Sequence, residues 1–399
     1  MSQRNHIDRL VLFVVLLLMV ASIVVVYSAS STWAFQKLGS ASGLVNKHIA
    51  KVLIGIVAIF IGMNIDYHKY KSFTKIALIG ALGLLVFTIA IGGEIKGAAR
   101  WLNIGGFSLQ PSEIAKFALL FHLSILLATK KDKIADYQNG FLPLMLWIGA
   151  VVVLVMLQPN FSTGSVIFVL GITMLFIGGA KLKHIVLSLL PLIPLLLLYM
   201  VSAEYRRKRL MSFVHFITSF LGFDDGTAVA ATASTTNYQL WQGIIGFGNG
   251  GILGVGMGQS KQRDLFLPES YGDFVFSIVG EEYGFIGTVF FLSLFLIILL
   301  RGFRIAKNAP DDFGKYLAIG ITCTIIIYAL GNALVTLGIF PTTGLPMPFV
   351  SYGGTAIIFS AFAIGVLLNI SSQTDLHPRL KKEKPRTPVD AEPAVGKVY

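Results

Sequence analysis

Long apolar stretches recur along the whole chain and determine the kind of fold it can adopt. Ten of them approach the roughly 20 apolar residues that a helix needs to cross a bilayer core about 30 Å thick. The first, followed by "YSASS", has the look of a signal peptide, but the further spans favour a first transmembrane helix. The stretches cover residues 10–27, 48–65, 74–92, 111–129, 141–157, 162–179, 184–201, 273–300, 317–340 and 346–370. The sequence therefore predicts an all-α polytopic membrane protein with ten transmembrane helices.

Composition agrees with a membrane class. The chain is 55% hydrophobic and 13% charged, whereas a soluble domain carries about a quarter charged residues. The net charge of +12 does not indicate nucleic-acid binding, because the basic residues fall mostly between apolar stretches. The single cysteine, Cys323, cannot form an internal disulfide or a Cys-rich metal site.

The basic residues predict the orientation of the spans. Lys and Arg gather before the first span and after the second, fourth, sixth, eighth and tenth. The positive-inside rule makes that side cytoplasmic, with both termini there. Residues 1–371 form the predicted membrane domain, and the Pro- and Lys-rich residues 372–399 a disordered cytoplasmic tail. A long loop, residues 202–272, then lies outside, and loops of such length are usually functional.

The outer loop opens with "EYRRKRLMSFVHFITSFLGF", which predicts an interfacial helix with a basic cluster. Arg206 and Arg207 in that cluster either snorkel at the membrane surface or capture an anionic, phosphorylated substrate. The residues leave both open.

A glycine-rich stretch follows, "GIIGFGNGGILGVGMG", with a formal G-x-G-x-x-G at Gly246, Gly248 and Gly251. A dinucleotide site needs this motif inside a βαβ unit, and no such unit is predicted. We expect instead tight turns and close approach of the backbone to a ligand or another helix.

Four acids lie in "FLPESYGDFVFSIVGEEYGFIG". Asp273 is either the N-cap of the following helix or a general base at the membrane surface. Helical spacing places Asp273, Ser277, Glu281 and Gly284 on one face. Charges inside a span are costly, so Glu281 and its neighbour Glu282 are expected to face a cavity or a partner.

Two further stretches are unusual for membrane spans. In "ARWLNIGGFSLQPSEIAKF", Pro111 and Glu113 suit the first turn of a helix, and Lys116 is placed to pair with Glu113 or to line a cavity with it. "GIFPTTGLPMPFVSYGGTA" is broken by Gly and Pro and must line a cavity or be buried in protein. Broken helices also mark transporters, so a transport function stays open.

Together these stretches resemble the SEDS family, the cell-shape, division and sporulation proteins FtsW, RodA and SpoVE. The resemblance covers nearly the whole chain, and "RWLNIGG" and "VGEE" are closer to FtsW-type members. It implies a peptidoglycan glycosyltransferase that polymerises lipid II on the outer face of the cytoplasmic membrane, at the division septum. It also implies a class B penicillin-binding protein and other division proteins as partners.

The family's catalytic aspartate lies in a motif of the form P-E-x-H-T-D-F, which corresponds here to residues 268–274. Asp273 matches, whereas Tyr271 replaces the usual His and Gly272 the usual Thr. By this resemblance Asp273 is the general base. Glu269 in the same motif either orients the base or binds a divalent cation such as Mg²⁺ or Mn²⁺. No other cofactor and no protein metal site is predicted.

Polymerisation of a lipid diphosphate-linked sugar needs a base for the attacking hydroxyl and cations near the leaving group. The candidate substrate-binding residues are Glu113, Lys116, Arg206, Arg207, Arg263, Glu269 and Glu281. Two alternatives remain: a lipid II flippase or other transporter, and a RodA-like polymerase of cell elongation. A scaffold role among division proteins is compatible with each.

Overall fold

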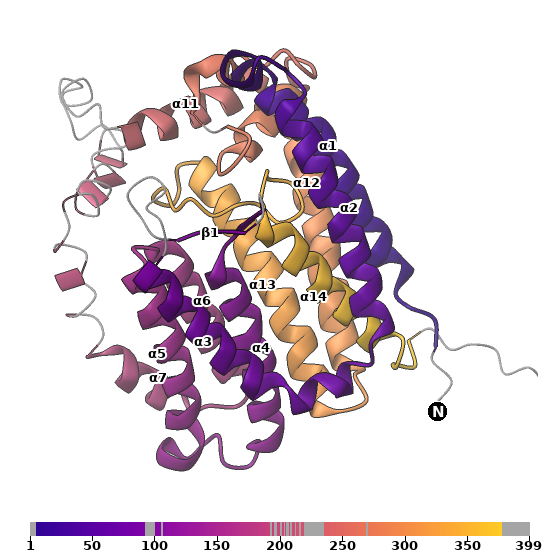
Figure 1. The fold of residues 1–399 in the computed structure, drawn as a ribbon, viewed down its shortest axis with the longest axis vertical. Helices are drawn as coiled ribbons and strands as arrows, with labels where there is room; N and C mark the ends of the chain where they lie inside the picture. Colours follow the sequence, from indigo (N-terminus) through magenta and orange to yellow (C-terminus); the bar gives the residue numbers. More distant parts are fainter. Residues whose placement is uncertain are drawn as a thin grey trace, which may run out of the picture.

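Helices dominate the fold (Figure 1). The computed structural model describes residues 5–91, 100–104, 107–191, 235–268 and 270–376, with scattered residues between 194 and 218. The helices that cross the body of the molecule are α1 (Arg9–Leu38), α2 (Gly43–Asn64), α3 (Thr74–Ile91), α4 (Pro111–Thr129), α5 (Leu142–Leu157), α6 (Phe161–Ile177), α12 (Val275–Lys307), α13 (Asp312–Thr336) and α14 (Thr355–Ser371). Shorter elements are η1 (Tyr67–Ser72), η2 (Tyr137–Phe141), α7 (Leu182–Leu189), α11 (Thr235–Gly250) and η3 (Gln262–Phe266).

Length and hydropathy identify the membrane-spanning helices. Within the described residues, six are long and apolar enough to cross a membrane: α1, α2, α4, α5 together with η2, α12 and α13. α3, α6 and α14 are apolar but shorter. The predicted class, a helical membrane-spanning protein, is confirmed. The count of ten spans and the outer position of residues 202–272 stay predictions.

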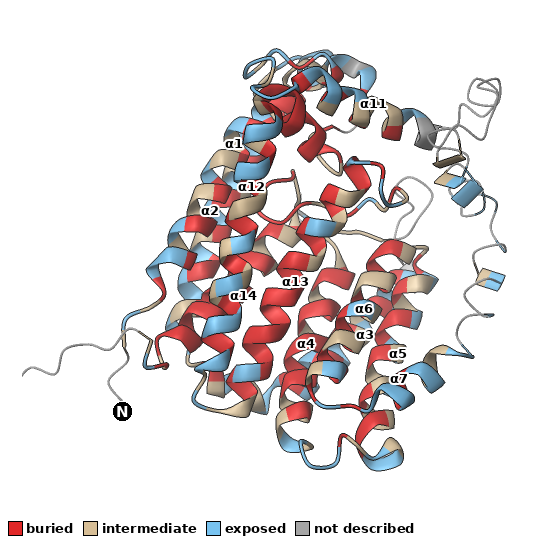
Figure 2. Cartoon of the chain, turned by 180° about the vertical axis from the view of Figure 1, so that it is seen from behind, coloured by how far each residue is buried: buried red, intermediate tan, exposed pale blue. Residues whose placement is uncertain are grey.

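Two helices form the interior of the bundle. In α4 and α13, 72% of the most apolar window is buried, against 33% in α12. Figure 2 shows the buried residues concentrated along these inner helices, while the peripheral helices expose one face. Polar side chains on α4 and α13 are therefore shielded from lipid by protein.

The segment between α13 and α14 departs from the prediction. We predicted a span over 346–370, but α14 begins at Thr355, and residues 337–354 form no helix. Hydropathy counts "GLPMPFV" as apolar, yet Pro341, Pro346 and Pro348 lack the N–H that a helix interior requires. The irregular stretch, residues 337–354, is hereafter the broken segment.

α12 is broken as well, at Gly284. This residue has φ 65° and ψ −162°, a conformation open almost only to glycine. The glycine-rich residues 251–256 fill the break with four backbone hydrogen bonds. The amides of Val255 and Gly256 donate to the carbonyls of Glu281 and Glu282, and those of Phe285 and Ile286 donate to the carbonyls of Gly251 and Ile252. The predicted tight turns and close backbone approach are confirmed here.

Glycines also let α11 lie directly on α12. A Cβ on Gly250 would lie 2.0 Å from the Gly280 carbonyl oxygen, and one on Gly280 would lie 2.2 Å from the Phe247 ring. Gly246 and Gly248 of the formal dinucleotide motif lie within α11, so they do not form the strand-to-helix turn of a dinucleotide site.

A short antiparallel hairpin, β1 (Leu102–Ile104) and β2 (Phe107–Leu109), precedes α4, with Leu102 opposite Leu109. Pro111 occupies the first turn of α4, as predicted.

At the other end of α13, Asp311 joins the start of this helix to η1. Its carboxylate accepts from the Gly314 amide (2.9 Å), the Tyr67 hydroxyl (2.8 Å) and the Lys71 ammonium (2.7 Å). Burial raises the pKa of Asp311, but these hydrogen bonds outweigh it and hold the pKa below its usual value. Asp311 is the N-cap of α13.

The N-terminus packs beside the end of α14. The Asn5 amide donates to the Ser372 carbonyl (2.7 Å), and the Arg301 guanidinium pairs with buried Asp8 (2.8 Å). Of the predicted tail, the structure describes Ser372 to Leu376, and residues 377–399 lie outside the described residues.

Candidate functional site

Asp273 lies where the loop before α12 meets the broken segment. The Asn332 side-chain amide, on α13, donates to the Asp273 carbonyl (2.7 Å) and to the Leu345 carbonyl (2.8 Å). Gly344, with φ 74°, faces the Asp273 side chain, because a Cβ built there would lie 3.2 Å from Asp273 Oδ2. One amide therefore ties Asp273 to the broken segment, and a glycine leaves room for its carboxylate.

The N-cap interpretation of Asp273 does not fit this helix start. α12 begins at Val275, and its N-cap position is Phe274. Asp273 therefore precedes the helix, and the prediction that it shares a helical face with Ser277 and Glu281 is wrong. Ser277 and Glu281 face α11, where a Cβ on Gly243 would lie 3.0 Å from Ser277 Oγ.

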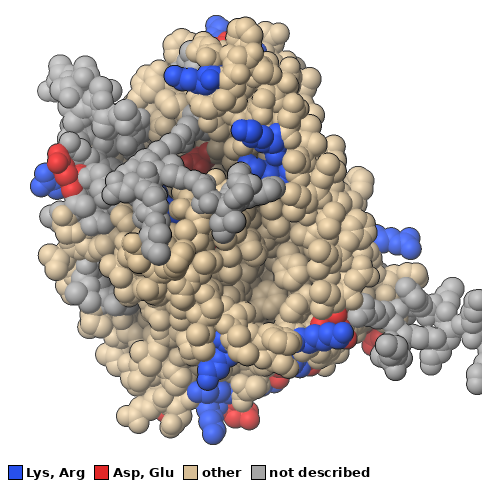
Figure 3. All heavy atoms as spheres, viewed as in Figure 1, with Lys and Arg blue, Asp and Glu red and all other residues tan. Residues whose placement is uncertain are grey.

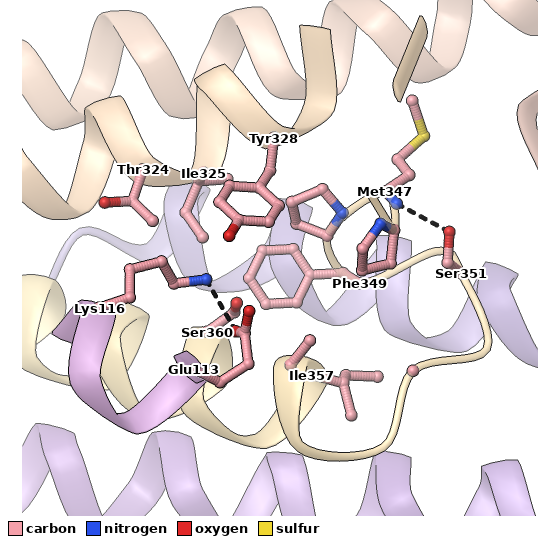
Figure 4. A pocket seen from close by; sticks show the side chains of 14 residues that line it. Glu113, Lys116, Thr324, Ile325, Tyr328, Met347, Phe349, Ser351, Ile357 and Ser360 are labelled. Atoms are coloured by element: carbon pink, nitrogen blue, oxygen red, sulfur yellow. Dashed lines mark hydrogen bonds and ion pairs between the residues drawn. The ribbon is translucent and has the colours of Figure 1, made fainter. Parts of the chain in front are cut away.

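A buried ion pair lines a pocket beside the broken segment (Figure 4). The Lys116 ammonium lies 2.7 Å from Glu113 Oε2, with side-chain exposures of 2% and 3%, so the predicted pairing is confirmed. The same ammonium lies 4.0 Å from the centroid of the Tyr328 ring on α13. The cavity among the lining residues is small, about 10 Å³, close to the space that one water molecule needs. The sequence left open whether Glu113 and Lys116 pair with each other or line a cavity. In the structure they do both.

The broken segment forms the opposite wall of this pocket. Phe349 is buried there with φ 63°, a left-handed conformation that is strained for a bulky side chain. The Ser351 hydroxyl accepts from the Met347 amide (2.8 Å) and fixes the turn around it. Such strain persists only where the surroundings hold it, and it clusters at functional sites.

The pocket and Asp273 adjoin along α13. Tyr328 lines the pocket and Asn332 holds the Asp273 backbone. These two residues are four apart, just over one turn, or about 6 Å along the helix axis. Figure 3 shows acidic atoms at the bottom of a recess in the upper half of the molecule, with basic side chains beside it. The arrangement puts a carboxylate, a buried ion pair and irregular backbone in one region.

Glu281 and Glu282 lie away from this pocket and attach the loop that precedes α12 to that helix. The Glu281 carboxylate accepts hydrogen bonds from Asn249 Nδ2 (3.2 Å), the Ser260 hydroxyl, and the amides of Lys261 (3.2 Å) and Gln262 (3.2 Å). Glu282 accepts from the Ser28 hydroxyl and the Gly258 amide (3.0 Å). Both acids do face partners, as predicted, and the partners are protein groups. A substrate contact for Glu281 stays a prediction.

Of the other candidate residues, the structure describes Arg263 and Arg207. Arg263, on η3, donates to the Ser28 carbonyl of α1 (3.3 Å) and lies 3.6 Å from Asp264. Arg207 is exposed, while Arg206 and Glu269 lie outside the described residues. A diphosphate contact for the three arginines stays a prediction.

The sequence did not lead us to predict several residues of this region. Asn332 and Tyr328 are polar groups at helical spacing inside a span, a pattern that could have marked them. Phe349 carried no signal, because its conformation depends on the surrounding fold.

The divalent cation also stays a prediction. Within the described part of the chain, no three His, Cys, Asp or Glu side chains come together to hold a metal. An ion here would suit the mode in which one or two carboxylates share Mg²⁺ with substrate phosphates.

Comparisons with known proteins agree with this architecture. The family model FtsW/RodA/SpoVE, described as "Cell cycle protein", matches residues 8–376. The chain is 36% identical over 368 residues to "Probable peptidoglycan glycosyltransferase FtsW" of Geobacter metallireducens, covering 92% of this chain and 95% of that protein. It is 36% identical over 373 residues to "Stage V sporulation protein E" of Bacillus subtilis, covering 93% and 98%.

Solved structures share the fold. Thermus thermophilus rod shape determining protein RodA superposes with a TM-score of 0.66 at 23% identity, covering 92% of this chain and 98% of that chain. A chain from "Structural coordination of polymerization and crosslinking by a peptidoglycan synthase complex" gives 0.71 at 23% identity, with the same coverage. The family match over most of the chain and the relatives at 36% identity show that the protein belongs to the FtsW/RodA/SpoVE family.

Proposed function

We propose that this protein is a peptidoglycan glycosyltransferase that polymerises lipid II, a diphosphate-linked disaccharide on an undecaprenyl tail. The relatives named for this activity support the proposal. The observation that carries it is the meeting of Asp273 with the broken segment, one helical turn from the Glu113–Lys116 pocket.

Asp273 acts as the general base. A sugar hydroxyl of one substrate attacks the anomeric carbon of another, and the bond from that carbon to the diphosphate oxygen breaks. The hydroxyl proton passes to the Asp273 carboxylate, and the diphosphate leaves with its lipid. Asn332 positions the base through its backbone, and Gly344 keeps the space beside the carboxylate open.

Charge at the leaving group needs cations nearby. Lys116 is already neutralised by Glu113, so this pair orders the pocket and accepts only weakly charged parts of the substrate, such as sugar hydroxyls. Arg206, Arg207 and Arg263 remain the proposed contacts from the outer loop, and Glu269 the residue that orients the base or holds a divalent ion.

Purified protein in liposomes with labelled lipid II tests this function. Glycan polymer formed without a second enzyme is the expected result, and the Asp273→Asn variant should form none. Movement of lipid II across the bilayer with no polymer would instead identify a transporter. The broken segment favours that second candidate, because discontinuous helices mark transporter sites.

We further propose ten spans, cytoplasmic termini and an outer loop at 202–272. Single cysteines in a Cys323→Ala background report this topology. A cysteine at Ser40, in the exposed α1–α2 turn, should label from outside, and one at Asn308, after α12, only in permeabilised cells. The reverse pattern would invert the orientation.

We place the activity in septal wall synthesis, with a class B penicillin-binding protein and other division proteins as partners. FtsW-named relatives support this assignment. Depletion should then yield filaments that fail to divide. Rounded cells would point to a RodA-like role in elongation.

A further inference from the structure

A second lysine lies inside the membrane-spanning part of the protein. Lys51 is partly buried in α2, eight residues after its first residue, Gly43, or about 12 Å along the helix axis. An ionisable side chain within a span normally faces a cavity or a partner and marks function. Lys51 therefore needs an explanation that the Asp273 pocket does not supply.

Lys51 and Lys116 share one arrangement and differ in one respect. The Lys51 ammonium lies 3.8 Å from the centroid of the Tyr352 ring, as Lys116 lies 4.0 Å from that of Tyr328. Glu113 neutralises Lys116, whereas no ion pair among the described residues includes Lys51. Lys51 thus keeps its positive charge available, held in place by an aromatic face.

Tyr352 connects Lys51 to the loop of the proposed base. The Tyr352 amide donates to the Tyr271 carbonyl (2.9 Å), and the two rings meet edge to face at 5.7 Å. Tyr271 precedes Asp273 by two residues. Figure 1 shows α2 and α4 on different sides of α14, so the two lysines flank the broken segment from opposite helices.

A further polar group beside Lys51 lacks a partner. His48, one turn earlier on α2, is fully buried, and its Nε2 lies 2.9 Å from the Ser22 hydroxyl. Within the described structure its Nδ1 makes no hydrogen bond. The His48 ring lies 5.8 Å from that of Tyr352. The Ser22 hydroxyl donates to the Met19 carbonyl (2.6 Å), so His48 Nε2 donates to Ser22 and the buried Nδ1 is left as an acceptor, which does not suit a phosphate oxygen. A ligand group at this position would meet the Lys51 ammonium and the Tyr352 ring.

We propose that Lys51, seated on Tyr352, binds a phosphate group of the lipid-linked substrate on the α2 side of the broken segment. The inference rests on the proposed function, which supplies a diphosphate between a membrane-embedded tail and a sugar. An ammonium suits a phosphate as a compact point charge. Tyr352 joins Lys51 to the loop that carries Asp273, so a headgroup held on Lys51 would lie on the side of the proposed base.

Direct lipid binding to the full-length protein in nanodiscs tests this site without turnover. The probes are undecaprenyl diphosphate and undecaprenol, which share the tail and differ in the phosphates. Lys51→Gln should weaken binding of undecaprenyl diphosphate about tenfold or more and leave undecaprenol unchanged. Lys51→Arg should retain most of the affinity.

Lys47 provides the matched control, because it is an exposed lysine one turn earlier on the same helix. Lys47→Gln removes the same charge and should change the affinity for undecaprenyl diphosphate less than threefold. An equal loss in both lysine variants would reduce the effect to general electrostatics. Equal loss of both lipids in Lys51→Gln would reduce it to packing of α2. Either result overturns the proposal, as does unchanged binding.

The occupant and the parent function are tested separately. The Lys51→Gln effect should persist in nanodiscs that contain phosphatidylglycerol, and its disappearance would assign the site to bulk anionic lipid instead. Inorganic diphosphate should compete only weakly, since it lacks the tail. If the wild type made no glycan but the Lys51 effect held, the phosphate site would stand and polymerisation would fall. Glycan synthesis with unaltered lipid binding in Lys51→Gln would remove the phosphate site alone.

Discussion

Two aspartates precede long transmembrane helices, and the fold uses them differently. Asp311 caps α13, and its carboxylate accepts hydrogen bonds from the Gly314 amide, the Tyr67 hydroxyl and the Lys71 ammonium. Asp273 precedes α12 without occupying its cap position, and the fold positions its backbone through Asn332 while its carboxylate faces Gly344. A residue type favoured for helix starts is thus structural at one end of the bundle. At the other end it faces the broken segment, beside the pocket.

The largest expected effect is that of Asp273→Asn. An amide cannot hold the proton that a general base accepts, so glycan synthesis should fall by about 10²–10⁴-fold. Thermal stability should stay near that of the wild type, because α12 does not depend on this side chain for its cap. Glycan product per folded protein measures the first quantity, and thermal unfolding in detergent the second. Near-normal glycan synthesis by Asp273→Asn would mean that Asp273, like Asp311, has only a structural role.

Glu113 sharpens the comparison, because it is paired like Asp311 yet lines the pocket that adjoins Asp273. Lys116→Met leaves a buried carboxylate without its partner and should lower the free energy of unfolding by about 3–5 kcal/mol. The double variant Glu113→Gln with Lys116→Met removes both charges and should recover part of that loss. A double variant as unstable as the single one would mean that the loss comes from packing, not from an uncompensated charge.

Asp311→Asn should have a smaller effect, and on stability alone. It removes the charge that Lys71 meets but leaves an oxygen for the Gly314 amide, so we expect a loss of about 1 kcal/mol. Glycan synthesis per folded molecule should equal that of the wild type, measured beside Asp273→Asn as the contrasting control. A fall in specific activity similar to that of Asp273→Asn would contradict the division of roles.

The pH dependence of unfolding gives the finest distinction. The pKa of Asp311 is below its usual value in the folded protein. Its stabilisation is therefore present above the unfolded-state pKa, about 3.9, and is lost as the pH falls through the folded-state pKa. Wild-type thermal stability should drop more steeply below about pH 4 than that of Asp311→Asn. If the stability of the wild type and of Asp311→Asn fell in parallel with pH, the contacts of the ionised Asp311 carboxylate with Lys71 and Tyr67 would contribute nothing to stability.

Sequence predicted much of the frame and less of the site. Hydropathy located the apolar helices of the described bundle, and a spacing of three residues predicted the Glu113–Lys116 pair, because both signals are local. The start of the last helix was misplaced, since hydropathy does not register that prolines break the backbone pattern. The contacts of Asp273 with Gly344 and of Lys51 with Tyr352 join distant segments, and no periodicity within either segment encodes them.

The break at Gly284 bears on how the chain assembles during membrane insertion. Backbone groups on both sides of the break form hydrogen bonds with residues 251–256, and a bilayer offers no substitute for these partners. α12 therefore cannot form a stable independent span unless residues 251–256 pack into its break. Insertion of this helix and folding of the preceding glycine-rich turn form a single cooperative event. A lesion in the turn would thus surface as a defect in membrane integration, far from any effect on chemistry.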